Sequence, residues 1–190
     1  MKPETRREYF SIPNLLGYFR ILLLPFYLYI YVTAETTADY YLAAFLMVLS
    51  FLSDLLDGKI ARRFNMVTEF GKILDPVADK LTQGVLALSF AIRYPAITVL
   101  FIVFIIKELI QGIMGLVFIR KFDFRMNGAQ MHGKVCTCVL DAVMLILLLL
   151  PNIKYMYVTY LTFVTIAVMV YSFCRYMVMY WKVYREKRVK

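Results

Sequence analysis

Four aspartates stand at helical spacing inside otherwise apolar stretches of this sequence. Asp54 and Asp57 are three residues apart. Asp75 and Asp79 are four apart, so that each pair lies along one face of its helix. An ionisable side chain in such a segment is costly enough to indicate a functional site. Because four carboxylates can share a low-dielectric pocket only if protons or cations neutralise them, their arrangement points to bound cations.

Oxygen ligands favour hard divalent cations such as Mg²⁺ and Mn²⁺. Two such ions about 3.5–4 Å apart are a common device for in-line displacement at phosphorus. Zinc is not expected, because the chain has one histidine, His132, and no C-x-x-C pair. The sequence therefore predicts a site for two Mg²⁺ or Mn²⁺ ions, whose ligands are Asp54, Asp57, Asp75 and Asp79.

Small residues accompany the aspartates on both helices. Gly58 and Ala61 share the helical face of Asp54. Gly71 comes one turn before Asp75. Small residues let two helix backbones approach closely, and such an approach would bring the two pairs of carboxylates together.

Basic residues near the aspartates allow a simpler interpretation. Asp57 and Asp79 could pair with Arg62 and Lys80 near the lipid headgroups, without any chemistry. That interpretation does not account for four carboxylates at helical spacing beside a basic loop. For Arg20, in the first apolar segment, two interpretations stay open: the side chain reaches the membrane surface, or it pairs with one of the aspartates.

The segments that carry these residues are apolar enough to span a membrane. The chain has 190 residues, of which 62% are hydrophobic, and its mean hydropathy is +0.67. Soluble domains are nearer 45–50% apolar. At about 20 residues per span, this length predicts an all-α integral membrane protein with six transmembrane helices in a single domain, 1–190. The predicted spans cover roughly 15–33, 39–60, 72–93, 95–119, 135–151 and 154–181.

The residues before the first span predict a short amphipathic helix on the bilayer surface rather than a cleavable signal. Its apolar side would carry Tyr9, Phe10 and Ile12.

Lysine and arginine are concentrated in alternate connections, which orients the predicted bundle. By this distribution both termini and the aspartates face the cytoplasm. The net charge of +9 is thereby explained without a nucleic acid partner. Three cysteines, few and odd in number, exclude a disulfide scaffold. We expect an integral protein of the bacterial cytoplasmic membrane, with an organellar membrane left open.

The aspartates and their neighbours form one longer pattern, D-x2-D-G-x2-A-R-x8-G-x3-D-x3-D, which starts at Asp54 and ends at Asp79. It resembles, without gap or substitution, the signature of the CDP-alcohol phosphatidyltransferase family. Eight fixed positions arise by chance on the order of once in 10⁸ chains of this length. The six predicted helices and the I-P-N-L-L stretch at 12–16 also resemble the bacterial members.

The resemblance implies a reaction in which an alcohol hydroxyl displaces CMP from CDP-diacylglycerol. It implies that one metal ion is held by Asp54, Asp57 and Asp75. A second ion would be held by Asp54, Asp75 and Asp79. Asp79 would also be the catalytic general base toward the acceptor hydroxyl.

The resemblance also implies the substrate-binding residues and the assembly. Gly58, Arg62 and Thr68 would contact the CDP moiety. Ala61 and Gly71 would leave room for it. Members of the family are homodimers, so we expect the same of this chain.

The acceptor is predicted from shorter stretches. T-E-F-G-K-I-L-D-P-V-A-D-K at 68–80 resembles members whose acceptor is sn-glycerol 3-phosphate, and Lys134 would meet the acceptor phosphate. This chain departs from those members in three ways: Cys136 stands for a lysine, Leu140 stands for a glutamine, and two arginines of the fourth helix are replaced, by Lys107 and by Met114 or Gly115. Phosphatidylglycerol, the acceptor of the family's cardiolipin synthases, therefore stays open as the alternative. Serine and inositol phosphate are disfavoured by the D-P-V-A-D-K context.

A divalent-cation transporter is the alternative from another functional class, since aspartates in spans also mark ion pathways. A transporter would spread acidic residues through the depth of the membrane. Here the four aspartates cluster at one predicted level, beside Arg62, whose charge would repel a permeating cation. A scaffold without chemistry would leave the four carboxylates unexplained.

Overall fold

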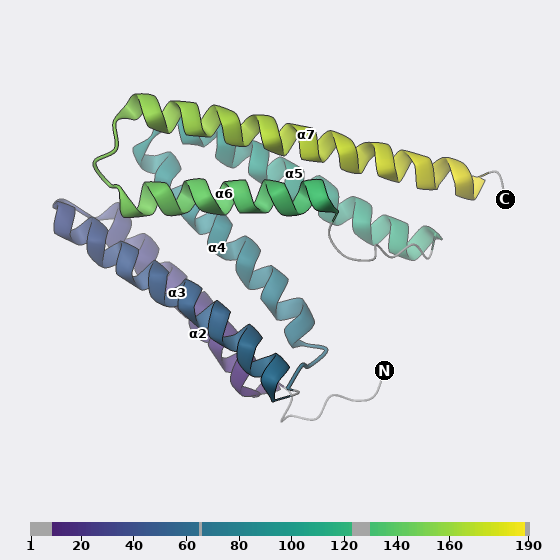
Figure 1. The fold of residues 1–190 in the computed structure, drawn as a ribbon, viewed down its shortest axis with the longest axis horizontal. Helices are drawn as coiled ribbons and strands as arrows, with labels where there is room; N and C mark the ends of the chain where they lie inside the picture. Colours follow the sequence, from purple (N-terminus) through teal and green to yellow (C-terminus); the bar gives the residue numbers. More distant parts are fainter. Residues whose placement is uncertain (1–8, 65, 123–129, 189–190) are drawn as a thin grey trace. The chain divides into compact units, whose positions relative to one another are not determined.

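A computed structural model describes residues 9–64, 66–122 and 130–188. All regular secondary structure in these residues is α-helical. The helices are α2 (Ile12–Val32), α3 (Thr37–Arg63), α4 (Gly71–Arg93), α5 (Pro95–Phe122), α6 (Met131–Leu149) and α7 (Tyr155–Arg188) (Figure 1). They coincide with the six apolar segments predicted from the sequence. The predicted surface helix falls largely on residues 1–8, outside the described part of the chain.

Five of these helices are long and apolar enough to cross a membrane: α2, α3 over Thr37–Ala61, α5, α6, and α7 over Tyr155–Glu186. This confirms an all-helical chain of membrane-protein character. Helix α4 does not reach that threshold, because its first half carries Lys72, Asp75, Asp79 and Lys80. The prediction of six spans is therefore supported for five, and the sixth stays a prediction.

The chain divides into two compact units, Met1–Ser89 and Phe90–Lys190. The first contains α2, α3 and most of α4. The second contains α5, α6 and α7. The predicted single domain spans both units and is not tested by this division.

In the first unit, α2 packs along α3 and is joined to α4 by polar contacts near both of its ends (Figure 1). At one end Asn14 donates from Nδ2 to Oγ1 of Thr68, over 3.1 Å. At the other, the hydroxyls of Tyr27 and Ser89 lie 2.8 Å apart, and both residues are fully buried. Later residues of α2 meet later residues of α4, so the two helices run parallel.

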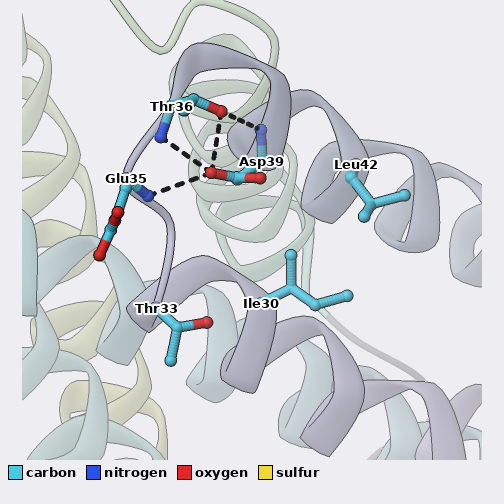
Figure 2. Close-up of a pocket in the computed structure, with 6 residues that line it drawn as sticks. All are labelled: Ile30, Thr33, Glu35, Thr36, Asp39 and Leu42. Carbon is cyan, nitrogen blue, oxygen red and sulfur yellow. Dashed lines mark hydrogen bonds between the residues drawn. The ribbon is translucent and has the colours of Figure 1, made fainter.

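The turn between α2 and α3 is closed by a capping box (Figure 2). The Thr36 hydroxyl oxygen accepts a hydrogen bond from the backbone N–H of Asp39. In return, Oδ2 of Asp39 accepts from the backbone N–H of Thr36 at 2.8 Å and from that of Glu35 at 3.1 Å. These bonds satisfy backbone donors that the first turn of a helix otherwise leaves unpaired. They fix a sharp reversal of the chain.

In the second unit, α7 lies alongside both α5 and α6 (Figure 1). Phe118 of α5 stacks on Tyr180 of α7, with 4.7 Å between the ring centroids. On α6, His132 lies edge-on to Tyr176 at 4.5 Å. A Cβ atom on Gly133 would overlap the ring and hydroxyl of Tyr176, so the glycine lets α6 approach α7.

Candidate active site

A single guanidinium group lies among the signature aspartates of the first unit. Nη1 of Arg20 on α2 is 2.5 Å from Oδ1 of Asp54 and 2.6 Å from Oδ1 of Asp79. Nη2 of the same side chain donates to Oδ2 of Asp57 over 2.9 Å. Arg20 therefore joins α2 to both α3 and α4. Of the two interpretations of Arg20, pairing with the aspartates is confirmed.

The cluster is closed on one side and open on the other. Arg20 is 2% exposed and the Asp57 side chain 6%. By contrast, the Asp54 side chain is 41% exposed and the Asp79 side chain 51%. A ligand can therefore reach Asp54 and Asp79 from outside, while Asp57 and Arg20 form the floor.

Asp75, the fourth predicted metal ligand, also belongs to this neighbourhood. It lies one helical turn before Asp79 on α4 and is exposed. It interacts electrostatically with Arg20 and with Asp54. Asp54, Asp57 and Asp79 thus converge from two helices on the Arg20 guanidinium, and Asp75 interacts with the same group electrostatically.

Asn14, Thr68 and Gly71 form a second group at the start of α4. The Thr68 hydroxyl oxygen accepts from the backbone N–H of Gly71 at 2.9 Å, as an N-capping residue does. Asn14, 2% exposed, donates to the same oxygen. A Cβ on Gly71 would lie only 2.8 Å from Oδ1 of Asn14. Glycine here is explained by the close approach of the Asn14 side chain.

The remaining predicted contacts to CDP lie at the end of α3. Gly58 and Ala61 are half-buried on the turns that follow Asp54 and Asp57. The Ala61 carbonyl accepts from the backbone N–H of Met66 at 2.9 Å, which closes the end of the helix. Arg62 is within α3, but its side chain lies outside the part of the structure that is described.

The predicted acceptor residues belong to the second unit. Lys134 is exposed in the first turn of α6. Lys107 on α5 forms an ion pair of 2.7 Å with its neighbour Glu108. Cys136 and Leu140, which replace polar residues of the resembling members, are both 3% exposed. Their burial explains why apolar side chains are accommodated at those positions.

Asn14 is the functional-site neighbour that sequence reasoning left without a role. It was visible only as part of the I-P-N-L-L stretch, and its partner Thr68 is 54 residues away. A polar residue directly before the first predicted span was the available signal.

The donor chemistry of the cluster fits hard divalent cations, because its open side presents carboxylate oxygens from two helices. Among the described residues, no three acidic, histidine or cysteine side chains converge closely enough to hold an ion as they stand. Instead, the Nη1 nitrogen of Arg20 contacts two of the carboxylates that would be ligands.

A sequence model of the CDP-alcohol phosphatidyltransferases matches residues 10–183, which cover most of both units. The chain belongs to this family.

Several curated relatives are named CDP-diacylglycerol–glycerol-3-phosphate 3-phosphatidyltransferase. The relative from Wigglesworthia glossinidia brevipalpis is 37% identical over 103 residues, 53% of this chain and 56% of its own length. The Escherichia coli K12 relative is 40% identical over 76 residues, and the match covers 40% of this chain and 41% of that protein. A Rickettsia typhi relative is 42% identical over 74 residues, with 39% and 41% covered. The matches thus span about half or less of each relative.

Proposed function

We propose that this chain transfers the phosphatidyl group of CDP-diacylglycerol to sn-glycerol 3-phosphate, forming phosphatidylglycerophosphate and CMP. The observation that carries the proposal is the convergence of Asp54, Asp57 and Asp79 on the Arg20 guanidinium, with Asp75 beside them. These are the acidic positions of the family signature. Phosphoryl transfer depends mainly on positioning and on neutralising charge, which such a cluster can provide once cations are bound.

The reaction assigns a role to each part of the cluster. The acceptor hydroxyl oxygen forms a bond to the phosphorus next to the diacylglycerol, and the bond from that phosphorus to the CMP oxygen breaks. Asp79 takes the hydroxyl proton as general base. Its partial exposure supports this role, because the acceptor must reach it.

Two Mg²⁺ or Mn²⁺ ions would be held by Asp54, Asp57, Asp75 and Asp79. When bound, they would supply charge neutralisation for the diphosphate. Gly58, Arg62 and Thr68 would contact the CDP moiety. Thr68 is already oriented by Asn14 and by the backbone of Gly71, which supports a fixed rather than a mobile contact.

The choice of acceptor rests on the names of the relatives and on Lys134, whose exposed ammonium group could bind the acceptor phosphate. Lys107 supports the choice less, since it is already paired with Glu108. Phosphatidylglycerol is the second acceptor to test, because Lys107 stands where an arginine would provide a bidentate fork.

We further propose that α4 is the sixth span, that both termini and the aspartates face the cytoplasm, and that the protein is a homodimer in a bacterial cytoplasmic membrane. The distribution of basic residues and the bacterial relatives support this placement. A cytoplasmic site would let a soluble acceptor meet a lipid that is already in the bilayer.

The test is CMP release by purified protein from CDP-diacylglycerol with Mg²⁺, with one acceptor in each assay. We expect release with glycerol 3-phosphate and little with phosphatidylglycerol, serine or inositol phosphate. Release with phosphatidylglycerol alone would replace the acceptor and retain the family reaction. Release with none of them, by protein shown to be folded, would contradict the proposal. Uptake of Mn²⁺ into proteoliposomes would then test the transporter alternative.

A further inference from the structure

We infer that Arg20 is an internal counter-ion of the catalytic carboxylates. When divalent cations bind, Arg20 releases Asp54 and Asp79 and stays paired with Asp57. This inference rests on the proposed function, because it concerns the cations that the reaction requires. It assigns a positioning role to a residue outside the signature. In the structure the guanidinium joins three of the aspartates, and metal binding would require it to move.

Arg20 occupies the carboxylate oxygens that a metal ion would need. Nη1 of Arg20 contacts Oδ1 of both Asp54 and Asp79, at 2.5 and 2.6 Å. Mg²⁺ takes carboxylate oxygens at about 2.0–2.1 Å. An ion bound to both oxygens would either fill the space of Nη1 or face it across the same two atoms. Two cations at such a separation repel each other strongly. Arg20 and the ion therefore compete for this pair of oxygens.

Only one of the Arg20 contacts, the one with Asp57, is fully buried. Nη2 donates to Asp57, and both partners are buried. Asp54 and Asp79, which share Nη1, are half exposed. The contacts that would be exchanged are thus the open ones, and the contact that would persist is the buried one. A rotation of the guanidinium about its contact with Asp57 would release Nη1.

The guanidinium of Arg20 also carries an unsatisfied hydrogen-bond donor. Nε of Arg20 is buried and has no hydrogen-bond partner in the described residues. An unmet buried donor is unfavourable, and it is more so on a charged group. The observed arrangement satisfies the carboxylates at the expense of Nε. A rearrangement that gives Nε a partner would therefore be favourable once the carboxylates acquire other cations.

Two states follow from these contacts. In the first, Arg20 is paired with Asp54, Asp57 and Asp79; in the second, metal ions are bound and Arg20 is paired with Asp57 alone. A ligand that binds only one of two states has its apparent affinity reduced by the population of the other. Arg20 should therefore weaken metal binding while it stabilises the metal-free fold.

The experiment titrates Mn²⁺ into metal-free, detergent-solubilised wild type, Arg20→Lys and Arg20→Gln. Binding is measured as the loss of the electron paramagnetic resonance signal of free Mn²⁺. Lysine keeps the charge but lacks the fork that bridges several carboxylates. We expect the Mn²⁺ dissociation constant to fall about tenfold in Arg20→Lys and further in Arg20→Gln. Both variants should unfold at lower temperature than wild type without metal, and should gain more stability from added Mn²⁺.

The matched control is Arg63→Gln, which removes the same charge from an exposed position at the end of α3. Its Mn²⁺ affinity should stay within about threefold of wild type, because exposed charges are screened by salt. The inference is wrong if Arg20→Lys has the Mn²⁺ affinity of wild type and Arg20→Gln has that of Arg63→Gln. Only a general effect of charge on Mn²⁺ affinity would then be present. Weaker Mn²⁺ binding in both Arg20 variants would also overturn it.

A measurement on wild type decides the matter if neither variant folds. In protein labelled with ¹⁵N in its arginine guanidinium groups, the buried Arg20 should have N–H hydrogens that exchange slowly with water. That hydrogen exchange should become faster when Mg²⁺ is added. An unchanged exchange rate at saturating Mg²⁺ would overturn the inference. The proposed function is judged separately by CMP release, so active wild type with unaltered Mn²⁺ affinity in the variants would remove the counter-ion role alone.

Discussion

Asn14 and Thr68 are hydrogen-bonded over 3.1 Å although 54 residues separate them in the chain. The bond joins the first turn of α2 to the residue that caps α4. Thr68 in turn accepts from the backbone N–H of Gly71. The start of α4 is therefore held by a side chain of another helix, and the position of Asp75 and Asp79 depends on it.

Gly71→Ala should destabilise the protein by about 1–3 kcal/mol, because the added Cβ would lie 2.8 Å from Asn14 Oδ1 and 3.0 Å from Thr68 Oγ1. The measurement is the thermal unfolding midpoint in detergent. Gly112→Ala on α5 is the control, since a Cβ there meets no atom within 4 Å. Adding Asn14→Ala to Gly71→Ala should recover part of the loss. Equal shifts for the two glycine variants would contradict the close approach.

Asp79→Asn should lower the rate of CMP release by about 10²–10⁴-fold, because the amide cannot accept the hydroxyl proton. The variant should remain folded and should still bind cytidine nucleotide. Asp39→Asn is the control: this carboxylate closes the α2–α3 turn, so its loss should lower the unfolding temperature and leave turnover intact. Turnover of Asp79→Asn at the wild-type rate would exclude Asp79 as the base.

Removal of divalent cations by a chelator should stop CMP release, and added Mg²⁺ or Mn²⁺ should restore it. The four aspartates leave the diphosphate facing like charges when no cation is bound. A titration of each ion back into chelated protein measures the effect. Full activity in excess chelator would contradict the metal-dependent reaction.

Tyr27→Phe should cost about 0.5–1.5 kcal/mol of stability, since it removes the buried hydroxyl that lies 2.8 Å from Ser89 Oγ. Ser89 keeps its bond to the Leu86 carbonyl, so no donor is stranded. The matched control is Tyr29→Phe on the same helix, where the side chain is 71% exposed. Thermal unfolding of both variants in detergent gives the comparison. A shift in Tyr29→Phe as large as in Tyr27→Phe would refute the buried contact.

The sequence predicted the six helices and the meeting of the aspartates, because both follow from periodicity. Apolar runs of about 20 residues mark spans, and a spacing of three or four places two side chains on one helical face. The structure confirms the six helices for the described residues, and it brings Asp54, Asp57 and Asp79 to one guanidinium group. The character of α4 was less predictable, since Lys72, Asp75, Asp79 and Lys80 leave it outside the five helices that are long and apolar enough to cross a membrane.

The partners of the cluster could not be predicted with the same certainty, because they come from a different helix. Nothing in the spacing of Asp54 and Asp57 identifies Arg20, which precedes Asp57 by 37 residues. Likewise, the pattern contains Gly71, and Thr68 stands three residues before it, but neither shows that Asn14 of α2 approaches both of them. Such contacts depend on how α2 packs against α3 and α4, which one sequence does not specify.

The short turn between α2 and α3 limits which insertions this protein can tolerate. Only residues 33–36 separate the two helices, and the capping box at Thr36 and Asp39 closes the reversal. One residue inserted between Arg20 and that turn would shift Arg20 by about 1.5 Å along α2 and rotate it by about 100°. The guanidinium would then point away from Asp54 and Asp57. Length variation among close relatives should therefore avoid the segment from Arg20 to Asp57 and collect in the other connections.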